Sequence, residues 1–107
     1  MRQIEFEILL TLATGERHGY AIIQDIEARS QGSLSVETGT LYRALQRLAE
    51  EDLVRLTDAP RGLESDDERR RFYAITAEGR RAATAEARRM AALVDAARVA
   101  SLLPGRS

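Results

Sequence analysis

The sequence predicts a mainly α-helical fold with a small β-hairpin. Four stretches carry apolar residues at the spacing of a helix, and two short segments rich in aliphatic and aromatic residues lie between the third and the fourth. The chain has 107 residues, of which 44% are hydrophobic. That length and composition are typical of one globular domain and argue against a disordered chain.

The first two helices are expected close to the N-terminus. Isoleucine and leucine side chains form an apolar stripe that predicts a helix over residues 3–14, which Gly15 closes. A second helix is predicted to begin at His18, to place its isoleucines in the core and to end before Gly32. Residues 31–36 connect it to the third helix. Because the lone histidine stands at a helix start and not among other metal ligands, we expect it to cap the helix or to pack.

The third helix, predicted over residues 38–51, is the most informative segment. Leu41, Leu45 and Leu48 form an apolar stripe at i, i+4 and i+7. At 100° per residue, the opposite face carries hydroxyls, an amide and two arginines, with no acid until Glu50. The residues of this face are Gly39, Thr40, Tyr42, Arg43, Gln46 and Arg47. Such a surface suits phosphates and base edges.

The second and third helices have the pattern of a helix-turn-helix whose second helix is basic. Arg43 and Arg47 lie one turn apart, where each could grip a phosphate or fork onto a guanine in the major groove. Thr40 and Tyr42 offer hydroxyls to phosphates, and Gln46 could bind an adenine. The alternative is a solvated face with pairs at i, i+4.

The hairpin is predicted from residues 53–57 and 70–75 as strands and residues 58–69 as its tip, the wing of a winged helix-turn-helix. Three adjacent arginines stand at the base of this wing: Arg69, Arg70 and Arg71. Since successive strand side chains point to alternate faces, at most two of them can meet one line of phosphates. Acids at the tip would repel DNA, so we expect the base to touch the backbone and the tip to stay away. The alternative is a solvated charge cluster.

A long last helix is predicted over residues 77–103, with Thr76 as its N-cap and Pro104 and Gly105 at its end. At 1.5 Å per residue it would extend about 40 Å, further than a small body can cover. Its apolar stripe consists of Ala83, Ala87, Met90, Leu93, Val94 and Ala97. A stripe that cannot be buried within one copy needs a partner, and a two-fold symmetric pair is the commonest solution. The alternative is that it packs entirely on the first helix.

Composition excludes several classes of protein. No apolar run approaches the roughly 20 residues of a membrane span, and the N-terminus lacks the order of a signal peptide, so we expect a cytoplasmic protein. The absence of cysteine excludes disulfides and thiolate metal sites. No nucleophile stands beside a base and no glycine-rich phosphate loop is present, so neither an enzyme nor a metal site nor a cofactor is expected. The net charge is -1, yet all sixteen positive side chains are arginine, which suits forked contacts to phosphate and guanine. The alternative is a genome-wide compositional bias toward arginine.

Three segments resemble the signatures of PadR-type transcriptional regulators. They are HGYAI at residues 18–22, GTLYRAL at 39–45 and RRRFYAIT at 69–76, in the order and spacing of the family. The resemblance covers about residues 4–100. It implies a winged helix-turn-helix dimer that binds operator DNA, usually as a repressor. It also implies that residues 1–76 form the DNA-binding domain and residues 77–107 a C-terminal dimerisation helix of the same compact unit.

The resemblance implies two sets of contacts. The last helix would pair with that of a second copy and contact its first helix, where Ile4 and Ile8 are the candidates. The candidates for DNA contact are Tyr20, Thr38, Gly39, Thr40, Tyr42, Arg43, Gln46, Arg47, Arg69, Arg70 and Arg71. Because two recognition helices enter successive major grooves about 34 Å apart, the operator is expected to be an inverted repeat.

Some relatives bind phenolic or drug-like effectors between aromatic residues of the last helix. The resemblance therefore also implies that a small molecule could bind this chain as an effector. The last helix of this chain carries no aromatic residue, and Asp52 stands where relatives commonly have glycine.

The competing hypothesis is a winged-helix module that binds a protein and not DNA. The acid-rich wing tip and the acidic isoelectric point favour that alternative.

Overall fold

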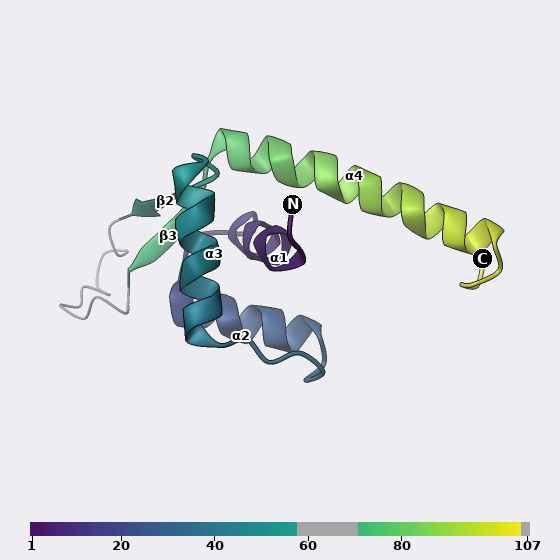
Figure 1. Ribbon diagram of the computed structural model, residues 1–107, viewed down its shortest axis with the longest axis horizontal. Helices are drawn as coiled ribbons and strands as arrows, with labels where there is room; N and C mark the ends of the chain where they lie inside the picture. The colour runs from purple at the N-terminus through teal and green to yellow at the C-terminus, as the bar shows by residue number, and fades with distance from the viewer. Residues whose placement is uncertain (58–70, 106–107) are drawn as a thin grey trace.

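The computed structural model describes residues 1–57 and 71–105, in which four helices and three strands form one unit. The elements are α1 (Gln3–Leu12), β1 (Arg17–His18), α2 (Gly19–Arg29), α3 (Thr38–Glu50), β2 (Val54–Thr57), β3 (Phe72–Ile75) and α4 (Ala77–Val99). Figure 1 shows α1 at the centre, with α2, α3 and α4 around it. The mainly helical fold with a small sheet agrees with the prediction, and the expected wing tip at residues 58–69 lies outside the described residues.

The sheet contains one strand more than predicted. In the described part of the chain, its order is β1-β3-β2, and both pairs are antiparallel. β1 pairs Arg17 with Tyr73 and His18 with Phe72. Gly15, at a φ of 144°, turns the chain from α1 into this strand. A strand of two residues is too short to show an alternation of polar and apolar side chains, so periodicity does not reveal it.

One hydrophobic core joins the first three helices to the sheet. It consists of Ile8, Leu9, Leu12, Ile22, Ile23, Ile26, Leu41, Ala44, Leu45, Leu48, Val54 and Tyr73. The leucine stripe of α3 is buried, as its i, i+4, i+7 spacing predicts. Each fully buried leucine or isoleucine contributes about 1.5–3 kcal/mol to folding. The core therefore fixes which face of α3 points away from the molecule.

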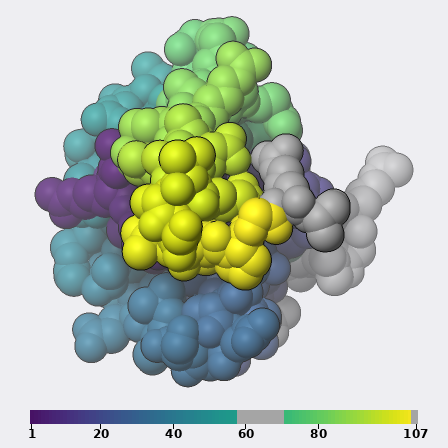
Figure 2. Space-filling model, turned by 90° about the vertical axis from the view of Figure 1, so that its right-hand side faces the viewer, coloured from purple at the N-terminus to yellow at the C-terminus, as the bar shows by residue number. Residues whose placement is uncertain are grey.

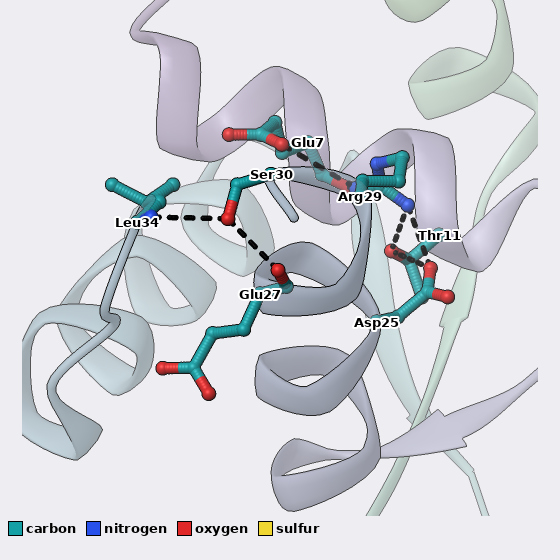
Figure 3. Close-up of polar contacts among 7 residues, drawn as sticks. All are labelled: Glu7, Thr11, Asp25, Glu27, Arg29, Ser30 and Leu34. Carbon is teal, nitrogen blue, oxygen red and sulfur yellow. Dashed lines mark hydrogen bonds and ion pairs between the residues drawn. The ribbon is translucent and has the colours of Figure 1, made fainter. Parts of the chain in front are cut away.

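A polar network ties α1 to α2 (Figure 3). The buried hydroxyl of Thr11 donates to Asp25 Oδ2 at 2.6 Å, and Arg29 Nη1 donates to the same oxygen at 2.6 Å. The second guanidinium nitrogen of Arg29 donates to the carbonyl oxygen of Glu7 at 3.1 Å. The Thr11 hydroxyl, and after it the charge of Arg29, hold the pKa of Asp25 below its usual range. The network therefore favours an ionised Asp25 at neutral pH.

The connection between α2 and α3 is also held by hydrogen bonds (Figure 3). The Ser30 hydroxyl donates to the carbonyl oxygen of Glu27 at 2.8 Å and accepts the backbone N–H of Leu34 at 3.0 Å. The carboxylate of Glu27 accepts the backbone N–H of Val36 at 2.9 Å. Since the second half of the connection is hydrogen-bonded to Ser30 and Glu27 at the end of α2, these bonds fix the spacing of the two helices, although the connection is longer than a tight turn.

The start of α4 is locked to the end of α3. The Thr76 hydroxyl accepts the N–H of Gly79 at 2.9 Å, as expected of an N-cap, and donates to the carbonyl oxygen of Asp52 at 2.6 Å. The backbone N–H of Thr76 donates to the carbonyl oxygen of Leu53 at 3.1 Å. Gly79 is buried, and a Cβ at this position would overlap that same carbonyl oxygen. This close approach fixes the direction in which α4 leaves the body.

Helix α4 ends at Val99 and not, as predicted, at residue 103. Ser101 adopts a left-handed φ of 63°, and the N–H groups of Ser101 and Leu102 donate to carbonyls of the last turn at 3.0 and 2.8 Å. This is the Schellman arrangement. Pro104 therefore follows the end of the helix and does not cause it.

Helix α4 carries the chain well beyond the body. The molecule measures 52 × 29 × 25 Å, and Figure 1 shows α4 along the long axis with its C-terminal half beyond the other helices. Figure 2 looks along that axis and shows the C-terminal residues in front of the rest of the molecule. No helix within residues 1–57 or 71–105 is both long enough and apolar enough to cross a membrane.

Candidate nucleic-acid interface

Helix α3 presents a polar face to solvent. The exposed residues of this face are Thr38, Gly39, Arg43 and Gln46, and the partly buried ones are Thr40, Tyr42 and Arg47. From residue 38 to residue 49 the helix contains two arginines and no acid. We call this set the α3 outer face. Its residues are those the sequence places opposite the leucine stripe, together with Thr38 at the helix start.

The side chain of Arg43 folds back onto the α3 outer face. Its Nη2 donates to the Thr40 hydroxyl at 3.4 Å, a long hydrogen bond. Its Nη1 lies 3.2 Å from the point that a Cβ on Gly39 would occupy. Gly39 therefore leaves room for this guanidinium. Because the side chain is exposed and only weakly held, it can swing outward without breaking the fold.

Tyr42 joins the two sequence motifs HGY and GTLY. It is partly buried and packs against the core, and its hydroxyl lies against Gly19, where a Cβ would overlap the oxygen. Gly19 is itself buried at the first position of α2. The glycine of one motif is therefore required by the tyrosine of the other. Tyr42 fixes α3 to the start of α2 and presents only part of its ring at the surface.

The start of α2 is built on His18. Its Nδ1 accepts the backbone N–H of Ala21 at 3.1 Å, and its ring meets that of Phe72 edge-on, with 5.6 Å between the centroids. This confirms the expected capping and packing role. Tyr20, in the first turn of α2, faces solvent and is 62% exposed. Tyr20 is thus available for a contact beside α3.

Arg47 is held by a residue that the sequence does not single out. Its Nε lies 3.0 Å from Oε2 of Glu5 on α1. The other oxygen of Glu5 accepts the backbone N–H of Arg2 at 3.0 Å, so the carboxylate also closes the first turn of α1. Burial raises the pKa of Glu5, but the hydrogen bonds from Arg2 and Arg47 outweigh it and leave the pKa below its usual range. No pattern in the sequence links residues 5 and 47.

The wing base is described only in part. Arg71 is exposed and directly precedes β3, whereas Arg69 and Arg70 lie outside the described residues. In residues 1–57 and 71–105 no group of three histidine, aspartate or glutamate side chains is arranged to hold a metal ion.

Residues 8–85 match the model of the transcriptional regulator PadR-like family. The chain belongs to this family. It is therefore a PadR-like transcriptional regulator and not an enzyme. The match runs from the middle of α1 through α2, α3 and the sheet to residue 85 of α4.

The PadR-like chain also resembles individual proteins. It is 34% identical over 73 residues to an uncharacterised protein of Lysinibacillus sphaericus, and the match covers 68% of this chain and 64% of that protein. A PadR family transcription regulator of Clostridium difficile has the same fold, with a TM-score of 0.73, 22% identity, and coverage of 91% of this chain and 96% of that chain. The Bacillus subtilis PadR, solved in complex with operator DNA, gives a TM-score of 0.64 at 22% identity, covering 78% and 45% of the two chains.

The residues expected to form the dimer interface of this PadR-like regulator fall into two groups. Ile8 is 0% exposed and belongs to the core of its own copy, so it offers no surface to a second copy, which corrects the expectation. Ile4 and Ala83 are partly buried against the same core. The remaining residues, which lie further along α4 and are exposed or partly buried, are Ala87, Met90, Leu93, Val94 and Ala97. Leu93 is the most exposed of the large ones, at 57%.

A buried acid interrupts the apolar side of α4. Glu86 forms ion pairs with Arg89 and with the N-terminal amine of Met1, the latter at 3.6 Å. The Arg89 hydrogen bond, more than the amine, lowers the pKa of Glu86. The first half of α4 is therefore fixed to the N-terminal segment of its own copy, and only the second half keeps a free apolar side.

Proposed function

We propose that this PadR-like chain binds an operator in double-stranded DNA as a homodimer and represses the gene that the operator controls. The observation that supports DNA binding is the α3 outer face, on which two arginines, hydroxyls and an amide stand without an acid from residue 38 to residue 49. A helix with such a face fits the major groove of B-DNA. Among structures with this fold, that of the Bacillus subtilis PadR contains operator DNA.

The exposed residues of the α3 outer face are the ones we assign to base edges. Arg43 and Gln46 lie about one turn apart, and both are exposed. An arginine fork suits guanine, and an amide suits adenine. Tyr20, on the first turn of α2, is assigned to a phosphate, as are Thr38 and Thr40 with the arginines of the wing base. Tyr42 would contact DNA only through the exposed part of its ring.

Dimerisation would take place through the second half of α4. Its exposed apolar residues stand beyond the body and cannot be buried within one copy. A two-fold pair would aim two α3 helices at successive major grooves about 34 Å apart, so the operator would be an inverted repeat. Such a dimer would repress by occupying the promoter, and it would act in the cytoplasm.

The experiment is a binding titration. A labelled duplex from the region upstream of the gene itself is titrated with protein, and fluorescence anisotropy is read at several salt concentrations. We expect specific binding that weakens steeply with salt. Arg43→Ala should lower the affinity by about 5- to 150-fold, which corresponds to about 1–3 kcal/mol. Arg81→Ala, which removes an exposed arginine from α4, is the matched control and should change little. Equal affinities for Arg43→Ala and the unchanged protein would reject the assignment of α3.

A second candidate is a winged-helix module that binds a protein instead of DNA. Exposed acids flank the α3 outer face at Glu37, Glu50, Glu51 and Asp52, and they favour this alternative because they would repel phosphates. The same titration separates the two. A module of this kind would leave the anisotropy of every duplex unchanged at low salt.

A further inference from the structure

One arginine of the α3 outer face is already paired inside the protein. Arg47 Nε lies 3.0 Å from the carboxylate of Glu5. Glu5 is 13% exposed, whereas Arg47 is 34% exposed, so the acid lies beneath the arginine and the arginine is still reached by solvent. The two residues belong to α1 and α3 and lie 42 positions apart in the chain. The pair therefore bridges the helix at the centre of the fold and the helix proposed to enter DNA.

The place of Glu5 is set independently of Arg47. One carboxylate oxygen accepts the backbone N–H of Arg2 at the start of α1, and the other faces Arg47. The hydrogen bond to the helix start keeps the carboxylate in position whether or not the arginine is present. A carboxylate fixed in this way offers a guanidinium what a DNA phosphate also offers, a single negative charge on an oxygen acceptor.

We infer that Glu5 is an internal competitor for Arg47, which a DNA phosphate must displace before this arginine can contribute to binding. This rests on the proposed DNA binding and adds a residue of α1 that sets its strength. As long as Glu5 is charged, the pair is neutral. If Arg47 stays on Glu5, it contacts no phosphate, and if it moves to a phosphate, Glu5 takes up a cation in its place. In both cases the net number of counterions released by the pair is close to zero.

The test removes the charge and keeps the shape. Glu5→Gln keeps one acceptor oxygen, which can stay with the backbone N–H of Arg2, and presents to Arg47 an amide NH2 that cannot accept, so it no longer competes with a phosphate for this arginine. Affinity for the operator duplex should rise by about two- to fivefold per protomer, the range of a partly exposed ion pair. The slope of log K against log [salt] should become steeper by about 0.9 per protomer, because one more phosphate is neutralised. Circular dichroism and thermal unfolding establish that the variant folds.

Two controls separate competition from a general change of charge. Glu7→Gln makes the same chemical change on the same helix, at a carboxylate that pairs with Arg29 of α2 and not with an arginine of α3, and should leave the salt slope unchanged. Arg47→Gln should abolish the gain from Glu5→Gln when the two are combined. An equal gain with glutamine at position 47 would mean that only bulk charge is felt, and a loss of affinity in Glu5→Gln would mean that Glu5 positions α3. Either result overturns the inference.

The outcome also distinguishes this inference from the proposed function. If the unchanged protein binds the operator and Glu5→Gln binds it with the same affinity and the same salt slope, only the inference is wrong. If neither protein binds any duplex, both are rejected.

Discussion

At the scale of single residues, Gly79 has an effect out of proportion to its size. It is buried in the first turn of α4, against the carbonyl oxygen of Leu53 and the side chain of Ile75. In a helix, alanine is about 1 kcal/mol more favourable than glycine. The contact with Leu53 reverses this preference, since backbone cannot move aside as the end of a flexible side chain can.

We predict that Gly79→Ala destabilises the protein by about 1–3 kcal/mol, although it raises helix propensity. Urea unfolding followed by circular dichroism measures the change. Gly105→Ala is the matched control, because nothing lies within 4 Å of a Cβ at that position. A Gly79→Ala variant as stable as the unchanged protein would show that α4 can move away from the carbonyl of Leu53 without a loss of stability.

At the scale of elements, pairs of helices are held by charged side chains as well as by the core. Asp25 joins α2 to Thr11 of α1, and Glu5 joins α1 to Arg47 of α3. Both acids have a pKa below the usual range in the folded protein. A lowered pKa contributes stability that is present above the unfolded-state pKa and is lost as the pH falls through the folded-state pKa. Both contacts between helices therefore weaken in acid.

We predict that the free energy of unfolding is level from about pH 5 to 7 and falls below about pH 4, where these carboxylates bind protons. Asp25→Asn should lower stability at pH 7 by about 1 kcal/mol, since the residue is partly exposed, and should make the loss in acid smaller. Urea titrations at a series of pH values measure both effects. Glu51→Gln, on the surface, should leave the acid dependence as it is, and an equal flattening by this variant would contradict the assignment to Asp25.

The elements also show what the sequence can predict. The stripe of α3 is predictable because its leucines repeat with the helical period, and the N-cap of α4 because Thr76 is a strong capping residue. β1 is not, since two residues have no period. The end of α4 is not, since Ser101 takes a left-handed conformation that favours glycine.

The candidate site divides in the same way. The exposure of Arg43 follows from its position opposite the leucine stripe, and this was predicted. The contact of Tyr42 with Gly19 and that of Arg47 with Glu5 join residues from different helices. Contacts between helices depend on how the helices pack in three dimensions, and helical periodicity carries no information on them.

At the scale of the whole molecule, α4 leaves an apolar side uncovered. The first half is fixed to α1 and to the N-terminal segment, and the second half stands clear of the body (Figure 1). Leu93 and Val94 lie on this second half and are exposed. Exposed apolar side chains on a projecting helix typically mark an interface with another protein molecule.

We predict that the protein is a dimer at micromolar concentration and that Leu93→Asp makes it a monomer, because a buried unpaired carboxylate is costly. Light scattering after size exclusion measures the mass. Val99→Asp is the matched control on the same helix, since Val99 is 88% exposed and lies on the opposite side from the apolar stripe. A dimer that persists in Leu93→Asp, or a monomeric unchanged protein, would exclude this interface.

The contacts of Thr76 and Gly79 with the segment after α3 form a corner that sets the direction of α4, so a small change of angle at this corner is amplified along the helix. From there α4 extends about 34 Å at 1.5 Å per residue, so a tilt of about 5° at the corner displaces its far end by about 3 Å. In a dimer joined at that far end, the same tilt alters the separation of the two α3 helices. In such a dimer, the packing of Gly79 against the carbonyl of Leu53 would set the distance between operator half-sites, and the proposed contacts of α3 would set the base preference. Evolution, or a protein engineer, could then change the spacing and the base preference of the operator separately.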